Sequence, residues 1–426
     1  MCYARHQAFY NRRMTKLVRP FAALRPVAEH AAAVIAPPYD VVSTAEARKL
    51  VTGRPNSFLR ISRPEIDLPS ATSAYSEAVY ARGAENLKRL IALGLLIRDP
   101  VPSYYAYRMR MGDHEQTGVA LTASVAAYDA NRVRRHERTR PDKEADRVRN
   151  ITSLNAQTGP VLSVYRANGT IKALLEKITQ EAPILNVTGQ HEVAHTLWRI
   201  DQPDLVDSVS DAFNAMDAIY IADGHHRSAA ASRVAADRST ASSAAPPRSA
   251  DFFLTVVFPH DEMNILDYNR IVRDLNGLSA QQLLERLSEK FDIKDDTGPV
   301  KPHNPGCFGM YADGRWLHLT LHAELIPEQD PVGGLDVSLL QDQLLAPILG
   351  VGDPSLDPRL EFVGGIRGLD VLQQRVDNGD AAVAFVLYPT SMEQLMAVAD
   401  AEQLMPPKST WFEPKLADGL LTYVLD

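Results

Sequence analysis

Residues 223–227, with the sequence DGHHR, combine side chains that can bind and transform a phosphate group. An apolar run at 219–222 precedes them and an alanine-rich segment follows, which predicts a strand, a glycine turn and a helix. The first turn of a helix offers unpaired backbone N–H groups, Gly224 permits close approach of a ligand, and the Arg227 guanidinium matches phosphate oxygens. We interpret the segment as an anion-binding cradle. The alternative is a capped helix with exposed polar residues.

The densest cluster of charges lies at residues 135–149, with the sequence RHERTRPDKEADRVR. It offers a base, cations for phosphate and carboxylates of the kind that bind Mg²⁺. The alternative is a solvated helix face with pairs of opposite charge four residues apart. Pro141 suits the first turn of that helix, with Thr139 as a nearby capping hydroxyl.

Three further segments carry polar residues that could reach a ligand. The proline pair before Tyr39 and Asp40 could hold both toward a site, although a structural turn explains it equally well. Lys408 and Ser409, in a PPKST segment, could bind an oxyanion or form a proline-rich turn. Asn269 could supply a polar ligand or cap a loop.

Residues 191–195, HEVAH, match the formal zinc-protease pattern. Gly189 lies two residues before His191 and a strand-like run follows the motif, so the long helix that this motif needs is not expected. A metal-dependent hydrolase that uses His191 and His195 with the two histidines of DGHHR is the third hypothesis.

Composition bounds the classes of function. The chain has 426 residues and a formal net charge of -8, and a bulk nucleic-acid binder would normally be basic, so we expect no nucleic-acid partner. The 2 cysteines cannot form a disulfide framework and fit a cytoplasmic protein. No apolar run is long enough to span a membrane, so we expect no membrane partner either.

The mixed order of predicted helices and strands favours an α/β fold, mixed α+β in detail. We expect an N-terminal extension at 1–16, an N-terminal α/β region at 17–235 that contains DGHHR, and a C-terminal α/β region at 250–426 packed on it. The low-complexity stretch 239–249 reads as a loop between them. Among the elements, we predict a helix from 44, strands at 57–62, 104–111 and 116–128, and a helix over 337–349.

Six motifs occur in an order that resembles the domain of unknown function 1015 family, from about Leu17 to the end of the chain. The family name itself supplies no activity. The motifs are IAPPYDVVS, RHERT with the following KEADR, YIADGHHR, DYNR, FVGGIRG and PPKSTWFEPKL.

A narrower resemblance links IADGHHRSAAA to the phosphate-binding strand, turn and helix of the ParB/sulfiredoxin-like fold. That fold includes free-serine kinases, sulfiredoxin and CTP-binding partition proteins. The resemblance implies a ParB/sulfiredoxin-like nucleotide-binding core, elaborated with further mixed-sheet segments, in which residues 223–227 contact phosphate. The catalytic glutamate of those kinases has no aligned counterpart here, so Glu137 and Glu144 are chosen by chemistry.

The leading hypothesis is a kinase that transfers phosphate from a nucleotide to a small hydroxyl metabolite such as serine, with ATP or ADP and Mg²⁺. The alternatives are a phosphatase of a metabolite such as phosphoserine, and a non-enzymatic nucleotide-binding regulator. The acceptor, the nucleotide and the oligomeric state stay open. The candidate residues comprise a catalytic group (Glu137, Glu144, His225, His226, Asp223), a phosphate- or nucleotide-binding group (Gly224, Arg227, His136, Arg138, Thr139, Lys143, Lys408, Ser409) and a substrate-binding group (Tyr39, Asp40, Asn269), with no protein ligand assigned to a metal.

Overall fold

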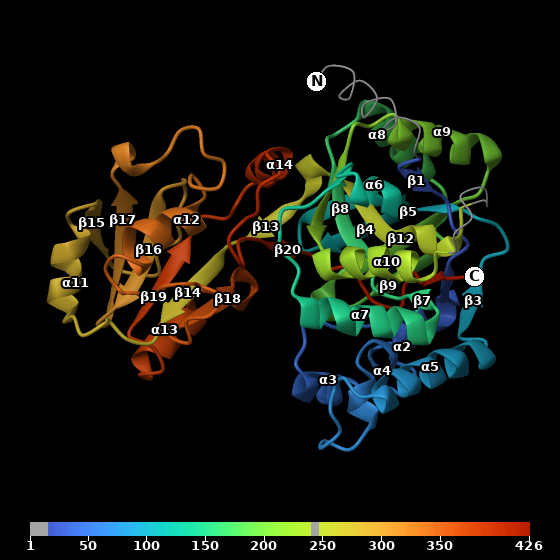
Figure 1. Ribbon diagram of the computed structural model, residues 1–426, viewed down its shortest axis with the longest axis horizontal. Coiled ribbons are helices and arrows are strands. Elements are labelled where there is room, and N and C mark those ends of the chain that lie inside the picture. Colours follow the sequence, from blue (N-terminus) through green and yellow to red (C-terminus); the bar gives the residue numbers. More distant parts are fainter. Residues whose placement is uncertain (1–15, 240–246) are drawn as a thin grey trace. The chain divides into compact units, whose positions relative to one another are not determined.

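The computed structural model describes residues 16–239 and 247–426 (Figure 1). The chain forms two compact units: unit 1 is Met1–Met263 together with Pro414–Asp426, and unit 2 is Asn264–Glu413. Each unit combines helices with a β-sheet, which confirms the mixed α/β fold class. The ParB/sulfiredoxin-like topology of the core stays a prediction. Most of the predicted N-terminal extension and the centre of the predicted 239–249 loop fall outside the described residues.

The boundaries between the units lie after Met263 and after Glu413, whereas the sequence predicted one boundary near residue 250. Strand β12 (Phe252–Pro259) belongs to unit 1 because it pairs with β5 (His114–Ser124) on one side and β8 (Val161–Tyr165) on the other. The end of the chain also returns to unit 1, where β21 (Tyr423–Val424) pairs with β7 (Ala156–Gln157). Unit 2 is therefore inserted into unit 1.

A mixed sheet forms the centre of unit 1. The order of its strands is β6-β11-β8-β12-β5-β4-β10-β9, with β1 added beside β5. Only the β6–β11 and β8–β12 pairs are parallel. The bounds of the remaining strands are β1 Val18–Arg19, β4 Tyr104–Met111, β6 Val133–Arg134, β9 Leu185–Thr188, β10 Ala194–Ile200 and β11 Ile219–Asp223.

Helices pack around this sheet in two groups. Helix α10 (His225–Asp237) packs on α7 (Pro141–Leu154) and α6 (Val125–Asp129), while α8 (Gly169–Ile178) packs on α9 (Pro203–Asn214). The N-terminal part adds a smaller hydrophobic cluster built on Phe58 and neighbouring side chains. Its elements are β2 Leu24–Pro26, α2 Ala31–Val34, α3 Thr44–Leu50, α4 Leu59–Ser62, α5 Glu77–Ala92 and β3 Leu96–Arg98.

Unit 2 contains an antiparallel sheet in the order β15-β17-β16-β19-β14-β18 and a separate pair, β13 with β20. The strands are β13 Asn264–Leu266, β14 Tyr268–Val272, β15 Phe291–Asp296, β16 Cys307–Ala312, β17 Arg315–Leu321, β18 Leu360–Gly364, β19 Val383–Leu387 and β20 Trp411–Glu413. The helices are α11 Ala280–Leu287, α12 Asp336–Leu340, α13 Asp370–Asp377 and α14 Met392–Asp400.

Several local predictions are confirmed and four are wrong. The helix predicted from 44 is α3, which starts at a capping box formed by Ser43 and Glu46. Pro141 occupies the first turn of α7, but Thr139 does not cap that helix, because its hydroxyl donates to Glu144. The segment predicted as a strand at 57–62 instead contains the short helix α4. Its apolar side chains are buried in the N-terminal hydrophobic cluster, and a segment this short can form either a strand or a helix.

The other two errors concern where elements end. Strand β5 stops at Ser124, whose side chain accepts a hydrogen bond from Ala127 N–H and starts α6, so the strand predicted to reach 128 is too long. The helix predicted over 337–349 divides into α12 and a π-helical turn, Gln341–Leu345.

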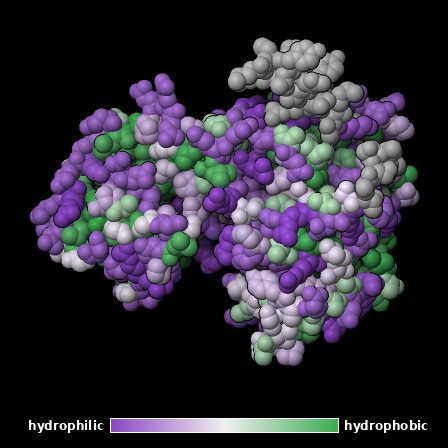
Figure 2. Space-filling view, viewed as in Figure 1, coloured by the Kyte–Doolittle hydropathy of each residue, from purple (hydrophilic) through white to green (hydrophobic). Residues whose placement is uncertain are grey.

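In the described parts of the chain, we find no helix with the length and apolar character needed to cross a membrane. Figure 2 shows hydrophilic side chains over much of the visible face, with smaller hydrophobic groups among them.

Candidate functional site

The DGHHR segment forms the strand, turn and helix that the sequence predicts. Strand β11 ends at Asp223, Gly224 adopts a left-handed conformation with φ of 99°, and α10 begins at His225. A Cβ at Gly224 would lie 3.1 Å from both Cζ and Nε of Arg227, in addition to the backbone strain. Glycine at this turn therefore gives the Arg227 side chain the space to fold back over the start of the helix.

The Arg227 guanidinium lies close to the end of β11. Its Nη1 donates a hydrogen bond to the carbonyl of Pro160, and its Nη2 lies 3.2 Å from Asp40 Oδ2 and 4.0 Å from Asp223 Oδ1. Burial favours the neutral form, but Asp40 and Asp223 together hold the pKa of Arg227 above its usual value. Its buried Nε has no hydrogen-bond partner among the described residues. Arg227 is thus a fixed cation with one donor left over.

Asp223 is held as a carboxylate by a lysine that sequence analysis did not select for the site. Lys415 Nζ donates to Asp223 Oδ2 at 3.1 Å. Although burial opposes ionisation, Lys415 and Arg227 keep the pKa of Asp223 below its usual value. Lys415 lies in the PPKSTWFEPKL motif, which was the only sequence signal pointing to it.

Two histidines form a buried pair behind the turn. The rings of His136 and His225 meet edge to face with centroids 4.4 Å apart. The backbone N–H of His136 donates a hydrogen bond to His225 Nε2 at 3.4 Å. This bond places the remaining ring proton of neutral His225 on Nδ1, which faces Glu137 Oε2 at 3.5 Å. Burial lowers the pKa of His136 to about 4 and lowers that of His225 well below 6.5. Both rings are therefore neutral near pH 7, and the Nδ1 atom of each makes no hydrogen bond among the described residues.

His226 occupies the partly exposed side of the turn. Its Nε2 accepts a hydrogen bond of 3.0 Å from the N–H of Arg140, at the start of α7. Burial lowers the pKa of His226, and the carboxylate of Asp40 opposes that shift. The loop before α7 and the start of α10 are therefore joined by backbone-to-histidine hydrogen bonds at both His225 and His226.

Most other side chains of the charged cluster around α7 form hydrogen bonds with neighbouring residues. Glu144 accepts hydrogen bonds from Thr139 Oγ1 at 3.0 Å and from Arg233 at 3.2 Å. Lys143 Nζ donates to Tyr75 Oη at 2.8 Å, and Arg138 is exposed. Glu137 is accordingly the predicted carboxylate that faces His225, whereas Glu144 links α7 to α10.

The segment that ends in Tyr39 and Asp40 reaches the same place. Asp40 pairs with Arg227, and the Arg147 guanidinium stacks 3.9 Å from the centre of the Tyr39 ring. Burial raises the pKa of Tyr39 to about 12, partly offset by Arg147, so its hydroxyl stays protonated. The structure thus brings the APPYD and DGHHR segments together.

Sequence analysis also missed Asp418, which is buried beside this cluster. Burial raises its pKa to about 7, opposed by Arg227 and supported by Asp40. Its Oδ2 has no partner among the described residues. The only signal in the sequence was an Asp-Gly pair, which predicts a turn and no chemistry.

The remaining predicted residues belong to unit 2. Asn269 is fully buried, donates to Asp267 and accepts a hydrogen bond from Leu387 N–H. Ser409 is also buried and donates its hydroxyl hydrogen to the carbonyl of Pro406, while the Lys408 ammonium lies 5.8 Å from the Tyr268 ring centre. Their part in phosphate or substrate binding stays a prediction.

The HEVAH histidines do not share a helix face. His191 has a φ of 53° in a short turn, and His195 lies in β10, where its Nδ1 is 2.8 Å from Tyr107 Oη. Within residues 16–239 and 247–426, no group of three or more His, Cys, Asp or Glu side chains is placed to hold a metal ion. We assign no protein ligand to Mg²⁺, because Asp40 and Asp223 are each paired with a cation.

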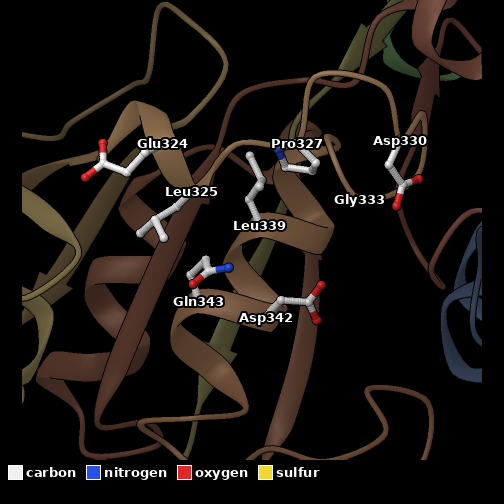
Figure 3. Close-up of a pocket in the computed structure, with 8 residues that line it drawn as sticks. All are labelled: Glu324, Leu325, Pro327, Asp330, Gly333, Leu339, Asp342 and Gln343. Carbon is white, nitrogen blue, oxygen red and sulfur yellow. The ribbon is translucent and has the colours of Figure 1, made fainter.

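A hollow of about 300 Å³ lies in unit 2 beside α12 (Figure 3). Three of its lining side chains are carboxylates, namely Glu324, Asp330 and Asp342, and none is basic. Its charge is unsuited to phosphate.

Fold and site together define a mixed α/β protein with a buried, carboxylate-flanked arginine at a helix N-terminus. The chain belongs to the family described as "Protein of unknown function (DUF1015)", whose model matches residues 18–338. The predicted family is thereby confirmed.

Solved structures similar to the chain include a free serine kinase in complex with AMP, at 12% identity and a TM-score of 0.34, covering 69% of this chain and 86% of that one. SbnI with a C-terminal truncation, from Staphylococcus aureus, is 11% identical with a TM-score of 0.37, covering 71% and 86%. A conserved hypothetical protein from Pyrococcus furiosus is 13% identical with a TM-score of 0.34, covering 72% and 95%. No curated protein matches the chain significantly.

Proposed function

We propose that unit 1 binds the phosphate of a nucleotide at the DGHHR cradle and transfers a phosphoryl group to a small hydroxyl metabolite such as serine. The observation that carries this proposal is Arg227, whose guanidinium at the start of α10 stays charged, with its side chain 10% exposed and its buried Nε without a partner among the described residues. Buried polar atoms in folded proteins are normally paired, so such an atom indicates a missing ligand or water. The resemblance of the segment to phosphate-binding turns supports the same ligand.

In this reaction the hydroxyl oxygen of the acceptor attacks the terminal phosphorus, the bond to the leaving nucleotide oxygen breaks, and the acceptor proton goes to a carboxylate. Glu137 is the better placed of the two predicted bases, because His225 Nδ1–H faces it at 3.5 Å while Glu144 is held by Thr139 and Arg233. Arg227 and the backbone N–H groups of α10 would bind the phosphate, with Arg138 and Lys143 proposed to offset further charge. Tyr39 and Asp40 are the proposed contacts to the acceptor.

The test is to incubate the purified chain with ATP or ADP, Mg²⁺ and L-serine and to follow phosphoserine by ³¹P NMR. We expect phosphoserine from the wild type and a loss of at least about 100-fold in rate for Glu137→Gln, since general-base catalysis contributes that much. A larger loss in Glu144→Gln than in Glu137→Gln would reverse the assignment of the base. No turnover with serine or other small alcohols would contradict the kinase proposal.

The same assay separates the two alternatives. Release of inorganic phosphate from added phosphoserine, without net transfer, is the outcome for a phosphatase. Saturable binding of a nucleotide by calorimetry without turnover is the outcome for a regulatory protein.

A further inference from the structure

Asp418 is fixed next to the APPYD segment by its backbone. Its N–H donates to the carbonyl of Ala36 at 2.9 Å, and the N–H of Ala36 donates to its carbonyl at 3.1 Å. The next residue, Gly419, has a φ of 82°, and a Cβ there would lie 2.5 Å from the Phe58 ring. The backbone at Asp418 therefore has little freedom to move, and its side chain is held in one place.

The side chains of Asp418 and Arg227 approach the same glycine, the first with its carboxyl and the second with its Cδ methylene. A Cβ at Gly159 would lie 3.4 Å from Arg227 Cδ and 3.5 Å from Asp418 Oδ1. The two charged groups are close enough for Arg227 to lower the pKa of Asp418, yet the carboxylates that pair with Arg227 are Asp40 and Asp223. Each keeps one buried atom that has no hydrogen-bond partner in the described part of the chain, Nε in Arg227 and Oδ2 in Asp418. An oxyanion with a hydrogen bond to each would satisfy both, provided that Asp418 carries a proton.

The charges around Asp418 permit that proton. Burial and the charge of Asp40 raise its pKa to about 7. The positive charges of Arg227 and Arg147 and a hydrogen bond with Ser62 lower that pKa. Of the other titratable groups in the cradle, His226 has a pKa that burial lowers and Asp40 opposes, and the nearby tyrosines keep their protons near pH 7. The pKa of Tyr39 is about 12, and Tyr107, which accepts a hydrogen bond from Ala417 N–H, has a pKa raised further still by burial.

We propose that Asp418 is a ligand-binding residue of the cradle, whose protonated carboxyl donates a hydrogen bond to a doubly charged oxyanion held by Arg227. The ligand class is a tetrahedral dianion, such as the terminal phosphate of a nucleotide. The ionised form of Asp418 repels the same ligand. This inference rests on the proposed function, because it assumes that the cradle binds phosphate.

The experiment measures sulfate binding by calorimetry from pH 5.5 to 8.5, a range in which sulfate itself stays a dianion. We expect wild-type affinity to fall about tenfold across this range, as one carboxyl ionises beside the ligand. Asp418→Asn, whose amide can donate at every pH, should flatten this dependence. Asp336→Asn is the matched control, because Asp336 is a buried carboxyl of unit 2 with a pKa also raised by burial to about 7, and its replacement should leave the dependence unchanged.

A wild-type measurement keeps the test informative if Asp418→Asn does not fold. At pH 7.5, sulfate binding measured in buffers of different ionisation enthalpy should show net uptake of a fraction of a proton. Sulfate binding with no proton uptake, or with the same pH dependence in Asp418→Asn, would overturn this inference and leave the proposed function standing. No binding of sulfate or ADP by the wild type at any pH would overturn both.

Discussion

The two units each bury an arginine in one of the motifs, and the two arginines are held in opposite ways. In unit 1, carboxylates flank Arg227, and its Nε has no hydrogen-bond partner within residues 16–239 and 247–426. In unit 2, Arg270 donates to the carbonyls of Tyr268 at 2.7 Å and Lys408 at 3.0 Å, and it stacks 4.5 Å from the Phe362 ring centre. Both side chains are cationic and largely buried, but of the two only Arg227 has a buried nitrogen without a partner among the described residues.

This difference separates a binding arginine from a structural one. Burial lowers the pKa of Arg270 to about 9, slightly opposed by Tyr268, and backbone carbonyls take its hydrogen bonds. Arg270 therefore clamps the loop that contains Lys408 to β14. Carboxylates hold Arg227 charged without using all of its donors, which is the arrangement that an anion site needs.

The largest effect should come from the buried carboxyls, one in each unit. Burial raises the pKa of Asp336 and of Asp418 to about 7. Because the folded chain holds each proton more tightly than the unfolded chain, unfolding free energy falls as pH rises from about 4 to about 7, by up to about 4 kcal/mol per carboxyl. The Asp336→Asn variant should no longer show this decrease in unfolding free energy in unit 2, and the Asp418→Asn variant should no longer show it in unit 1.

Urea unfolding at pH 5 and pH 8, followed by tryptophan fluorescence, checks this prediction in both units. Trp198 reports on unit 1, and Trp316 and Trp411 report on unit 2. An unchanged pH dependence in either variant would show that the carboxyl in question is ionised throughout.

Arg270→Ala tests the structural half of the comparison. It removes two hydrogen bonds from a buried cation and leaves the carbonyls of Tyr268 and Lys408 unpaired, so we expect a loss of about 3 kcal/mol in the stability of unit 2. Urea unfolding measures it. Affinity for ADP should stay at the wild-type value while the variant is folded, and a selective loss of affinity would make Arg270 a binding residue.

Arg227→Ala tests the binding half. Loss of charge-assisted hydrogen bonds should weaken ADP binding by about 1.5–3 kcal/mol, or roughly 10- to 150-fold, by calorimetry. Arg233→Ala is the matched control on the same helix, because that arginine is exposed and pairs with Glu144. Equal affinities of the two variants would remove Arg227 from the site.

Lys408→Ala should have the smallest effect. Lys408 is an exposed cation, so we expect less than about 1 kcal/mol of ADP affinity to be lost, and less again at high salt. Ser409→Ala should leave ADP affinity unchanged, since the hydroxyl of Ser409 already donates its hydrogen bond to the carbonyl of Pro406. Titrations at two ionic strengths measure both, and a loss above tenfold for Lys408→Ala would bring unit 2 into phosphate binding.

The fold class, the family and the local shape of the cradle could be predicted from the sequence because each depends on adjacent residues. An apolar run, a glycine and an alanine-rich segment are enough to predict β11, the turn and α10. The strand predicted at 57–62 failed because the three apolar side chains of this six-residue segment are buried equally well by a short helix.

The partners of Arg227 were beyond prediction for a different reason. Asp40 lies 187 residues away along the chain, and Lys415 lies 192 residues from Asp223. No periodicity or spacing relates residues so distant, so only tertiary packing reveals which carboxylate meets which cation. The same holds for Asp418, which local sequence describes only as part of a turn.

The insertion of unit 2 has a consequence for biosynthesis. The last segment, Pro414–Asp426, contributes Lys415 and Asp418, and its final strand pairs with β7. A nascent chain still attached to the ribosome has made every other part of the cradle long before these residues emerge. The cradle is therefore complete only once Pro414–Asp426 has been made and has packed back on unit 1, and deletion of this segment would remove its lysine and its buried acid together.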